Sequence, residues 1–174
     1  MRSGIAQFLR YLATERNASD WTIKAYREDQ QGLVDWLEAT RGSVPHPNAL
    51  SPQELRTFQA ALQQAGYART TISRKLASLR SFYRFAMRQG IANDNPAKPL
   101  RNPRRQRKLP HELSNAEVGK LLLAPPSDQT AGLRDRAILE TMYSAGLRVS
   151  ELVALRDGDI DTHEQIIRVR GKGR

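Results

Sequence analysis

The residues best suited to chemistry in this sequence are an arginine and a glutamate three positions apart, Arg148 and Glu151, just after Gly146. Side chains at i and i+3 of a helix lie next to each other, so the carboxylate can hold the guanidinium in one direction. A guanidinium held at the start of a helix is suited to gripping a phosphate group. The same spacing is also typical of an ordinary ion pair at the edge of a core, and the spacing alone leaves both interpretations open.

Several elements must position this pair. A turn at Gly146 is followed by a short helix with Val149, Leu152 and Leu155 on one face. A longer helix is predicted before it, over 133–145, with a core face of Ile138, Leu139 and Met142. A strand is predicted after it, over 166–170, because Ile167 and Val169 alternate with Arg168 and Arg170.

Two serines mark the predicted starts of helices by the same sequence pattern. Ser51 precedes Glu54 by three residues, with Pro52 at the first helical position, and Ser114 precedes Glu117 by three residues. Both are capping boxes, so helices are predicted to begin directly after them.

Three aspartates, Asp157, Asp159 and Asp161, alternate as they do in a calcium loop. The remaining positions of that pattern are wrong, because Thr162 stands where glycine is needed and Arg168 where the bidentate glutamate is needed. We therefore interpret the aspartates as turn and cap residues and expect no metal site.

The first half of the chain, residues 1–91, predicts a compact all-α bundle of four amphipathic helices with short loops. Ser19 is the expected N-cap of the second helix, which runs from about residue 21 to 40, and the fourth spans about 70–88. The expected core faces are Ile5, Phe8, Leu9 and Leu12; then Ile23, Tyr26, Leu33, Trp36 and Leu37; then Leu55, Phe58 and Leu62; then Ile72, Leu76, Leu79, Tyr83 and Ala86.

The fourth helix also carries many cations away from its core face: Arg69, Arg74, Lys75, Arg80, Arg84 and Arg88. A basic helix suits the DNA major groove, where arginine and lysine reach guanine edges and phosphates. A solvated charged face would produce the same pattern, and the sequence by itself does not separate the two.

Residues 92–110 predict a linker, because they contain four prolines and no apolar period. The stretch 98–108 holds six Lys and Arg and no acidic residue. Arg104, Arg105 and Arg107 are therefore expected to follow a nucleic-acid backbone, with the linker as a strap across a duplex. A disordered, non-specific basic segment is the alternative.

The 174 residues carry a net charge of +10, which favours a polyanionic partner, most simply nucleic acid. This charge is uneven: residues 1–97 contribute +5, residues 98–108 contribute +6 and residues 109–174 contribute −1. There is no cysteine, hence no disulfide and no thiolate chemistry. No stretch has the length of a membrane span, so a cytoplasmic, nucleoid-associated protein is expected.

The segment Tyr143–Leu152 (YSAGLRVSEL) resembles the motif around the first catalytic arginine of tyrosine recombinases and integrases, most closely those of the Xer type. The similarity extends back through Leu133–Ala137 and forward through Asp159–Asp161 to Gly171-Lys172-Gly173. It also covers the first half of the chain more loosely. The resemblance implies a mainly α fold: a SAM-like core-binding domain over 1–91, a basic linker over 92–110, and the start of a catalytic domain over 111–174.

The resemblance also implies roles for particular residues. Arg148 would bind the scissile phosphate, Glu151 would orient it, and Lys172 would be the general acid. The second and fourth helices of the first domain would approach the DNA major groove. The residues expected to contact DNA are Lys24, Arg27, Thr70, Arg74 and Lys75. No metal and no nucleotide cofactor would be needed, and the partner would be duplex DNA with an inverted-repeat site, bound by a recombinase tetramer.

The sequence departs from the family pattern at its end. The His-x-x-Arg motif and the late tyrosine nucleophile are missing before Arg174, and the five tyrosines present fall on other elements: Tyr11, Tyr26, Tyr67, Tyr83 and Tyr143. The chain as given is therefore expected to bind DNA without cleaving it. A non-enzymatic helical DNA-binding regulator and a basic RNA-binding protein are the alternatives. The sequence does not distinguish chromosome-dimer resolution from mobile-element integration.

Overall fold

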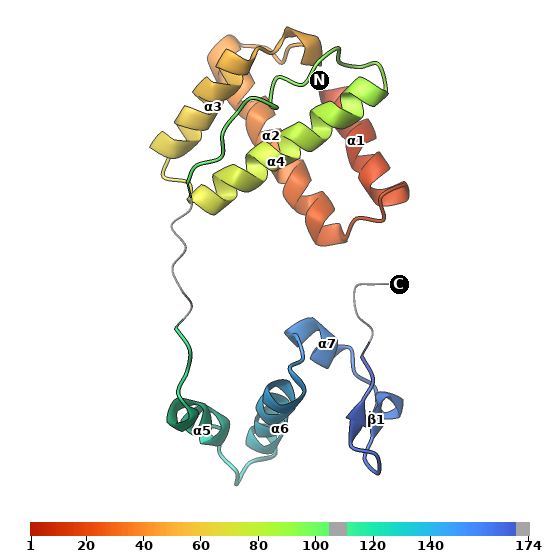
Figure 1. Ribbon diagram of the computed structural model, residues 1–174, viewed down its shortest axis with the longest axis vertical. Coiled ribbons are helices and arrows are strands. Elements are labelled where there is room, and N and C mark those ends of the chain that lie inside the picture. The colour runs from red at the N-terminus through yellow and green to blue at the C-terminus, as the bar shows by residue number, and fades with distance from the viewer. Residues whose placement is uncertain (105–110, 170–174) are drawn as a thin grey trace. The chain divides into compact units, whose positions relative to one another are not determined.

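The computed structural model describes residues 1–104 and 111–169. The chain divides into two compact units, Met1–Arg107 and Lys108–Arg174. Both are built mainly from helices, which confirms the predicted mainly α class (Figure 1).

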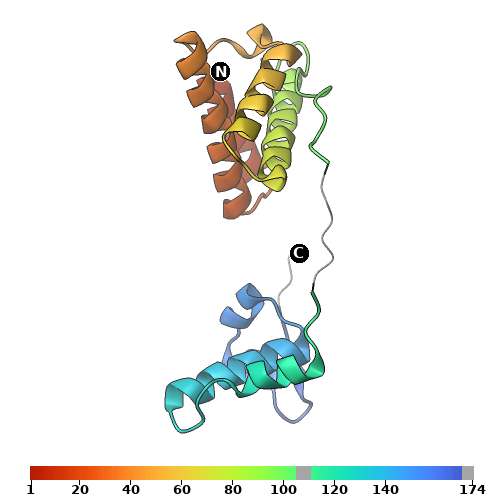
Figure 2. The same cartoon turned by 90° about the vertical axis from the view of Figure 1, so that its left-hand side faces the viewer.

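The first unit contains the four predicted helices: α1 (Arg2–Thr14), α2 (Asp20–Arg41), α3 (Pro52–Gln64) and α4 (Arg69–Arg88). A short 3-10 turn, η1 (Pro47–Ala49), interrupts the loop before α3 and was not predicted. Helix α4 packs against α1, α2 and α3, so it is the central element of this unit (Figure 2).

The core of the first unit follows the predicted apolar faces. All five core positions predicted on α4 are buried: Ile72, Leu76, Leu79, Tyr83 and Ala86. Phe82 and Phe85 are buried as well, although the predicted stripe omits them. They are buried because α4 has neighbours on several sides, which makes its buried arc wider than one stripe.

The second unit contains α5 (Asn115–Leu123), α6 (Thr130–Ala145) and the short α7 (Val149–Val153). They are followed by the 3-10 turn η2 (Asp157–Asp159) and two short strands, β1 (Ile160–Asp161) and β2 (Ile166–Ile167). The strands pair antiparallel, with Ile160 opposite Ile167.

The strand predicted over 166–170 is shorter in the structure, since β2 ends at Ile167 and Val169 lies outside it. The stretch of alternating aspartates, which were interpreted as turn and cap residues, also contains the partner strand β1; a search for alternating residues misses this strand because it is only two residues long. Gln165 completes the turn between the strands with a positive φ of 55°.

The predicted core of α6 is not formed within the described part of the second unit. Ile138 is 36% exposed, while Leu139 and Met142 are only half-buried. Among the described residues α6 packs mainly against α5 and α7, and much of its apolar face stays exposed or half-buried.

The structure also differs from the prediction for the first part of the linker. Ala92, Ala97 and Leu100 are buried and belong to the core of the first unit, so the first part of the predicted linker packs against the helices. These three small or apolar side chains are spaced irregularly among prolines and follow neither a helical nor a strand period. Their burial could therefore not be predicted from the sequence pattern.

The two predicted capping boxes are both present. The Ser51 hydroxyl accepts a hydrogen bond from the Glu54 N–H, and Glu54 Oε2 accepts one from the Ser51 N–H at 2.9 Å. Ser114 and Glu117 repeat this arrangement at α5. The hydrogen bond from the Ser51 N–H, with smaller contributions from the Ser51 hydroxyl and Arg41, holds the pKa of Glu54 below its ordinary value of 4.5.

Replacing Ser51 by alanine is expected to lower the free energy of unfolding of the first unit by about 1 kcal/mol. Because the native pKa of Glu54 is lowered, its stabilisation is complete above about pH 4.5 and is lost as the pH falls through the native value. The Ser51→Ala loss, measured by urea unfolding, should therefore shrink on acidification below pH 4.5. The matched variant Ser114→Ala, in the other unit, should leave this transition unchanged; an equal loss there would contradict the assignment.

Candidate phosphate site and nucleic-acid interface

Arg148 and Glu151 form the pair that their spacing predicts. Arg148 is the N-cap of α7 and lies two residues after the left-handed Gly146 (φ 62°), the C-cap of α6. Glu151 Oε2 accepts the Arg148 backbone N–H at 2.8 Å, and its Oε1 accepts the guanidinium Nη1–H at 2.8 Å. The glutamate therefore fixes both the backbone and the side chain of the arginine.

The two side chains of this pair differ in their exposure. The Arg148 side chain is 81% exposed, whereas that of Glu151 is 14% exposed. The hydrogen bonds from Arg148, first from its backbone N–H, lower the pKa of Glu151, so the carboxylate stays charged near neutral pH. Among the described residues only Nη1 of the guanidinium donates a hydrogen bond, so its other N–H groups are available for an anion.

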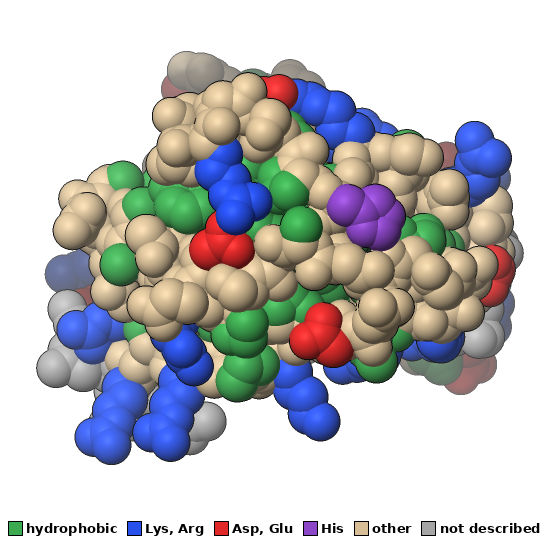
Figure 3. All heavy atoms as spheres, turned by 90° about the horizontal axis from the view of Figure 1, so that it is seen from above, with side chains coloured by type: hydrophobic (Ala, Val, Ile, Leu, Met, Phe, Trp, Pro, Cys, Tyr) green, Lys and Arg blue, Asp and Glu red, His purple; other side chains and the backbone are tan. Residues whose placement is uncertain are grey.

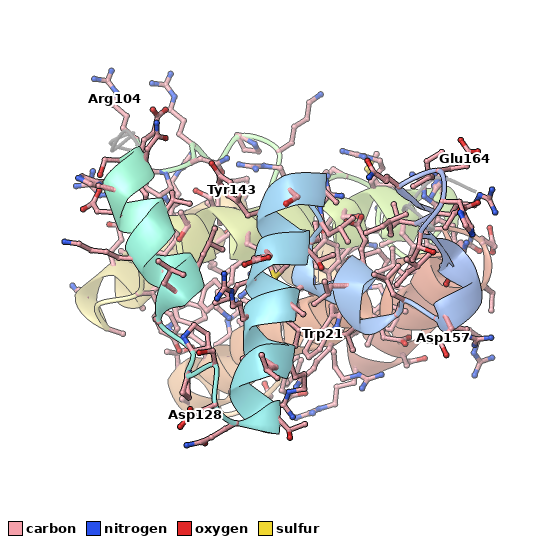
Figure 4. All side chains as sticks on the ribbon, turned by 90° about the horizontal axis from the view of Figure 1, so that it is seen from below. Trp21, Arg104, Asp128, Tyr143, Asp157 and Glu164 are labelled. Atoms are coloured by element: carbon pink, nitrogen blue, oxygen red, sulfur yellow. The ribbon has the colours of Figure 1, made fainter. Side chains whose placement is uncertain are left out.

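The predicted partner of this site, Lys172, lies outside the described residues, as do Arg105 and Arg107. The segment that leads toward it is described through Val169. Two of the alternating aspartates have the predicted turn and cap roles: Asp159 accepts from the Arg156 N–H at 3.0 Å and Asp161 from the His163 N–H at 3.1 Å. Figure 4 labels Tyr143 on α6, and Asp157 and Glu164 in the segment that follows α7.

The start of α2 presents two of the predicted DNA-contacting residues. Lys24 and Arg27 are both exposed, one turn apart. Trp21 is 79% exposed beside them, with the Lys24 ammonium 5.7 Å from the centre of its ring. Trp21 was not among the predicted DNA contacts; its place three residues before Lys24 and six before Arg27 was the available signal.

On α4 the predicted residues differ in their surroundings. Thr70 is exposed at the start of the helix. Arg74 is partly exposed, with 41% of its side chain accessible, whereas the side chain of Lys75 is only 9% exposed. The basic outer surface expected of α4 therefore does not include Lys75, whose contact with DNA stays a prediction.

Both residues pair with one buried carboxylate on α2. Arg74 Nη1 donates to Asp29 Oδ2 at 2.5 Å, and Lys75 Nζ lies 3.3 Å from Asp29 Oδ1. Burial raises the pKa of Asp29, and the two cations oppose that effect. Gln30 beside it is also buried and donates to the Ser78 hydroxyl at 2.9 Å. The burial of Asp29 and Gln30 was not predicted, because a polar residue on a helix is normally exposed.

The linker is attached to the first unit up to Arg104. The Arg80 guanidinium donates to the carbonyls of Ala97 (3.2 Å) and Leu100 (2.7 Å). Arg69 Nη1 donates to the Arg104 carbonyl at 3.0 Å, and Gln59 reaches the preceding part of the linker. Arg80 and Arg69 thus hold the backbone of the linker, while the Arg104 side chain is exposed (Figure 4).

Replacing Arg80 by glutamine is expected to release residues 97–102, because several charge-assisted hydrogen bonds are lost together. Cleavage by trypsin after Arg101 should become about tenfold faster, as for the loss of one or two such bonds. Mass spectrometry of a limited digest measures this cut. The variant Arg84→Gln removes an exposed arginine from the next turn and should not change the rate; equal acceleration would show a general loosening of α4.

Together these residues make a surface suited to an anionic polymer. Exposed cations come from α2 (Lys24 and Arg27), from α4 (Arg74) and from the linker (Arg104). Figure 3 shows Lys and Arg side chains projecting from the rim of the face that it draws. Spaced cations on helices bind phosphates irrespective of sequence, and those that enter a groove can also contact base edges.

Two family models match the chain. The N-terminal SAM-like domain of phage integrases matches residues 5–90, and the phage integrase family itself matches residues 111–174. Within the described residues no helix is long and apolar enough to cross a membrane.

Relatives and solved structures agree with these matches. The tyrosine recombinase XerC of Pelotomaculum thermopropionicum is 40% identical over 171 residues, which cover 97% of this chain and 56% of the relative. XerD of Yersinia pestis is 38% identical over 169 residues, with the same coverage. The Tn1549 transposon integrase, solved in complex with circular intermediate DNA, has the same fold, with a TM-score of 0.67 at 21% identity over 96% of this chain and 53% of that one. The chain thus spans little more than half the length of these relatives.

Proposed function

We propose, because the chain belongs to the phage integrase family of tyrosine recombinases, that it supplies the DNA-binding helical unit and the first part of the catalytic unit of a site-specific DNA recombinase. The whole protein would cleave and rejoin duplex DNA through a 3′-phosphotyrosine. The partner would be a duplex with an inverted-repeat site, bound by a tetramer. The chain described here would contribute recognition of DNA and the first arginine of the phosphate site.

The observation that carries this proposal is the double hydrogen bond from Arg148 to Glu151. A guanidinium that is exposed and already oriented needs little reorganisation to meet the charge that develops on a phosphate oxygen. In the proposed reaction Arg148 stabilises that charge, Glu151 keeps the guanidinium in position, and Lys172 donates a proton to the leaving oxygen.

The alternative of a non-enzymatic regulator shares the DNA-binding helices but has no use for an oriented Arg148. Replacing Arg148 by lysine keeps the charge and removes the planar fork. In a recombinase this change should leave DNA affinity nearly unaltered and abolish phosphate chemistry in the whole protein. In a regulator Arg148→Lys would leave DNA affinity unaltered, and there would be no phosphate chemistry to lose.

The direct test measures binding of the purified chain to a fluorescent 30-base-pair duplex and to a structured RNA of equal charge. We expect the duplex to bind more tightly, and the double variant Lys24→Gln/Arg27→Gln to weaken it by about tenfold or more. The control Arg2→Gln/Arg56→Gln removes the same charge from α1 and α3 and should have a smaller effect. Equal affinity for RNA, or equal loss in both variants, would refute the proposed interface.

A further inference from the structure

We propose that Asp29 is a positioning residue that aims one edge of the Arg74 guanidinium at DNA. The proposal rests on the DNA-binding function proposed above. It extends that function to a residue that is itself buried and does not touch DNA.

The first argument is the geometry of the guanidinium. Arg74 Nη1 donates to two acceptors, Asp29 Oδ2 at 2.5 Å and the Ala25 carbonyl at 3.2 Å. Both acceptors belong to α2, whereas Arg74 belongs to α4. Among the described residues, Nε and Nη2 make no hydrogen bond, and 41% of the side chain is exposed. One corner of the guanidinium is therefore held by α2, and the Nε–Nη2 edge is free.

That free edge has a particular chemical use. Two parallel N–H donors match two oxygens of a phosphate, or N7 and O6 of a guanine. An arginine whose orientation is already restricted loses less conformational entropy when it forms such a pair. Asp29 therefore raises the affinity of Arg74 for DNA although it is itself an anion.

The second argument is that Asp29 cannot move away. Its side chain has no exposed area, and Lys75 Nζ lies against its other oxygen at 3.3 Å. The Lys75 ammonium is enclosed in turn, 5.6 Å from the centre of the Tyr67 ring. It also lies close enough to Gly32 that a Cβ there would approach Nζ to 3.3 Å. The carboxylate is thus fixed between α2 and α4.

The charges of this cluster also point to an anion. One carboxylate serves two cations, so Asp29, Arg74 and Lys75 together carry one excess positive charge. A phosphate or an electronegative base edge at Arg74 would complete the pairing.

The competing explanation is that Asp29 only neutralises its neighbours. The two explanations predict opposite signs for Asp29→Asn, which keeps the shape and removes the negative charge. If Asp29 only neutralises, the added net positive charge should tighten DNA binding. If Asp29 positions Arg74, binding should weaken by about tenfold, the loss typical of one good charge-assisted pair.

The matched control is Asp35→Asn. Asp35 lies on the same helix and is exposed, and within residues 1–104 and 111–169 the one side-chain hydrogen bond it accepts comes from Gln31, at 2.6 Å. This variant changes the net charge equally without touching Arg74, so its affinity should be unchanged or slightly tighter. Weakening in Asp29→Asn together with no weakening in Asp35→Asn supports the proposal. Tighter binding in both variants overturns it.

A second variant keeps the test decisive if Asp29→Asn melts below the assay temperature. Arg74→Lys retains the charge, but a lysine ammonium that pairs with Asp29 offers no second edge. We expect it to weaken DNA binding about as much as Asp29→Asn. Where Asp29→Asn is folded, adding it to the Arg74→Lys background should cause no further loss. Full affinity in Arg74→Lys, or additive losses in the double variant, overturns the proposal.

Two duplexes distinguish where the free edge binds. One has an arbitrary sequence, and the other is selected by the chain from a random 30-base-pair pool. An equal loss on both assigns Arg74 to a phosphate, and a loss confined to the selected duplex assigns it to a guanine; either result supports positioning by Asp29. The unmodified chain is measured before the variants. If it binds neither duplex, the proposed DNA-binding function is refuted, and this outcome is distinct from a failure of the Asp29 proposal.

Discussion

Replacing Phe8 by alanine is expected to lower the free energy of unfolding of the first unit by about 3–5 kcal/mol. Phe8 is completely buried at the meeting point of three helices. Its ring centre lies 5.8 Å from that of Phe82, 5.6 Å from that of Phe85 and 6.2 Å from that of Tyr26. Truncation removes these contacts and leaves a cavity that the packed helices α1, α2 and α4 cannot close.

Urea unfolding followed by far-UV circular dichroism measures this loss. A unit of this size is ordinarily stable by about 5–15 kcal/mol, so the variant should unfold at a much lower urea concentration. Trp21→Ala is the control, because Trp21 is also a large aromatic residue but is 79% exposed. Its effect should stay within about 0.5 kcal/mol. Similar losses in the two variants would mean that Phe8 is not packed as described.

The affinity of the chain for a duplex of arbitrary sequence is expected to fall by about a hundredfold between 50 and 200 mM salt. Four described cations of the proposed interface are at least partly exposed: Lys24, Arg27, Arg74 and Arg104. If each neutralises one phosphate, the slope of log affinity against log salt is about −3.6. The physical cause is the release of counterions that the phosphates hold in free DNA.

Fluorescence anisotropy at four or five salt concentrations gives this slope. Arg104→Gln should make it shallower by about 0.9, because one phosphate contact is lost. Arg56→Gln removes an arginine from α3, outside the proposed interface, and should leave the slope unchanged. A slope near zero for the unmodified chain would contradict backbone binding, and a change in Arg56→Gln alone would move the interface to α3.

The sequence by itself determined those features that depend on residues close together in the chain. The four helices of the first unit follow from a 3.6-residue apolar period, and the starts of α3 and α5 follow from capping boxes over three residues. The Arg148–Glu151 pair was predictable for the same reason, since i and i+3 are neighbours on any helix.

Only the tertiary structure decided which charged side chains are exposed and which are held by partners within the protein. Arg74 and Lys75 look alike in the sequence, yet both meet Asp29, which lies 45 residues from Arg74, and Lys75 is removed from the surface. Arg80 looks like another DNA contact but holds the linker backbone. The spacing of residues along the sequence does not predict such pairings. They arise only when α2, α4 and the linker pack together, because buried polar groups must then find partners. The same dependence on packing explains why the apolar face predicted for α6 could not be equated with a core.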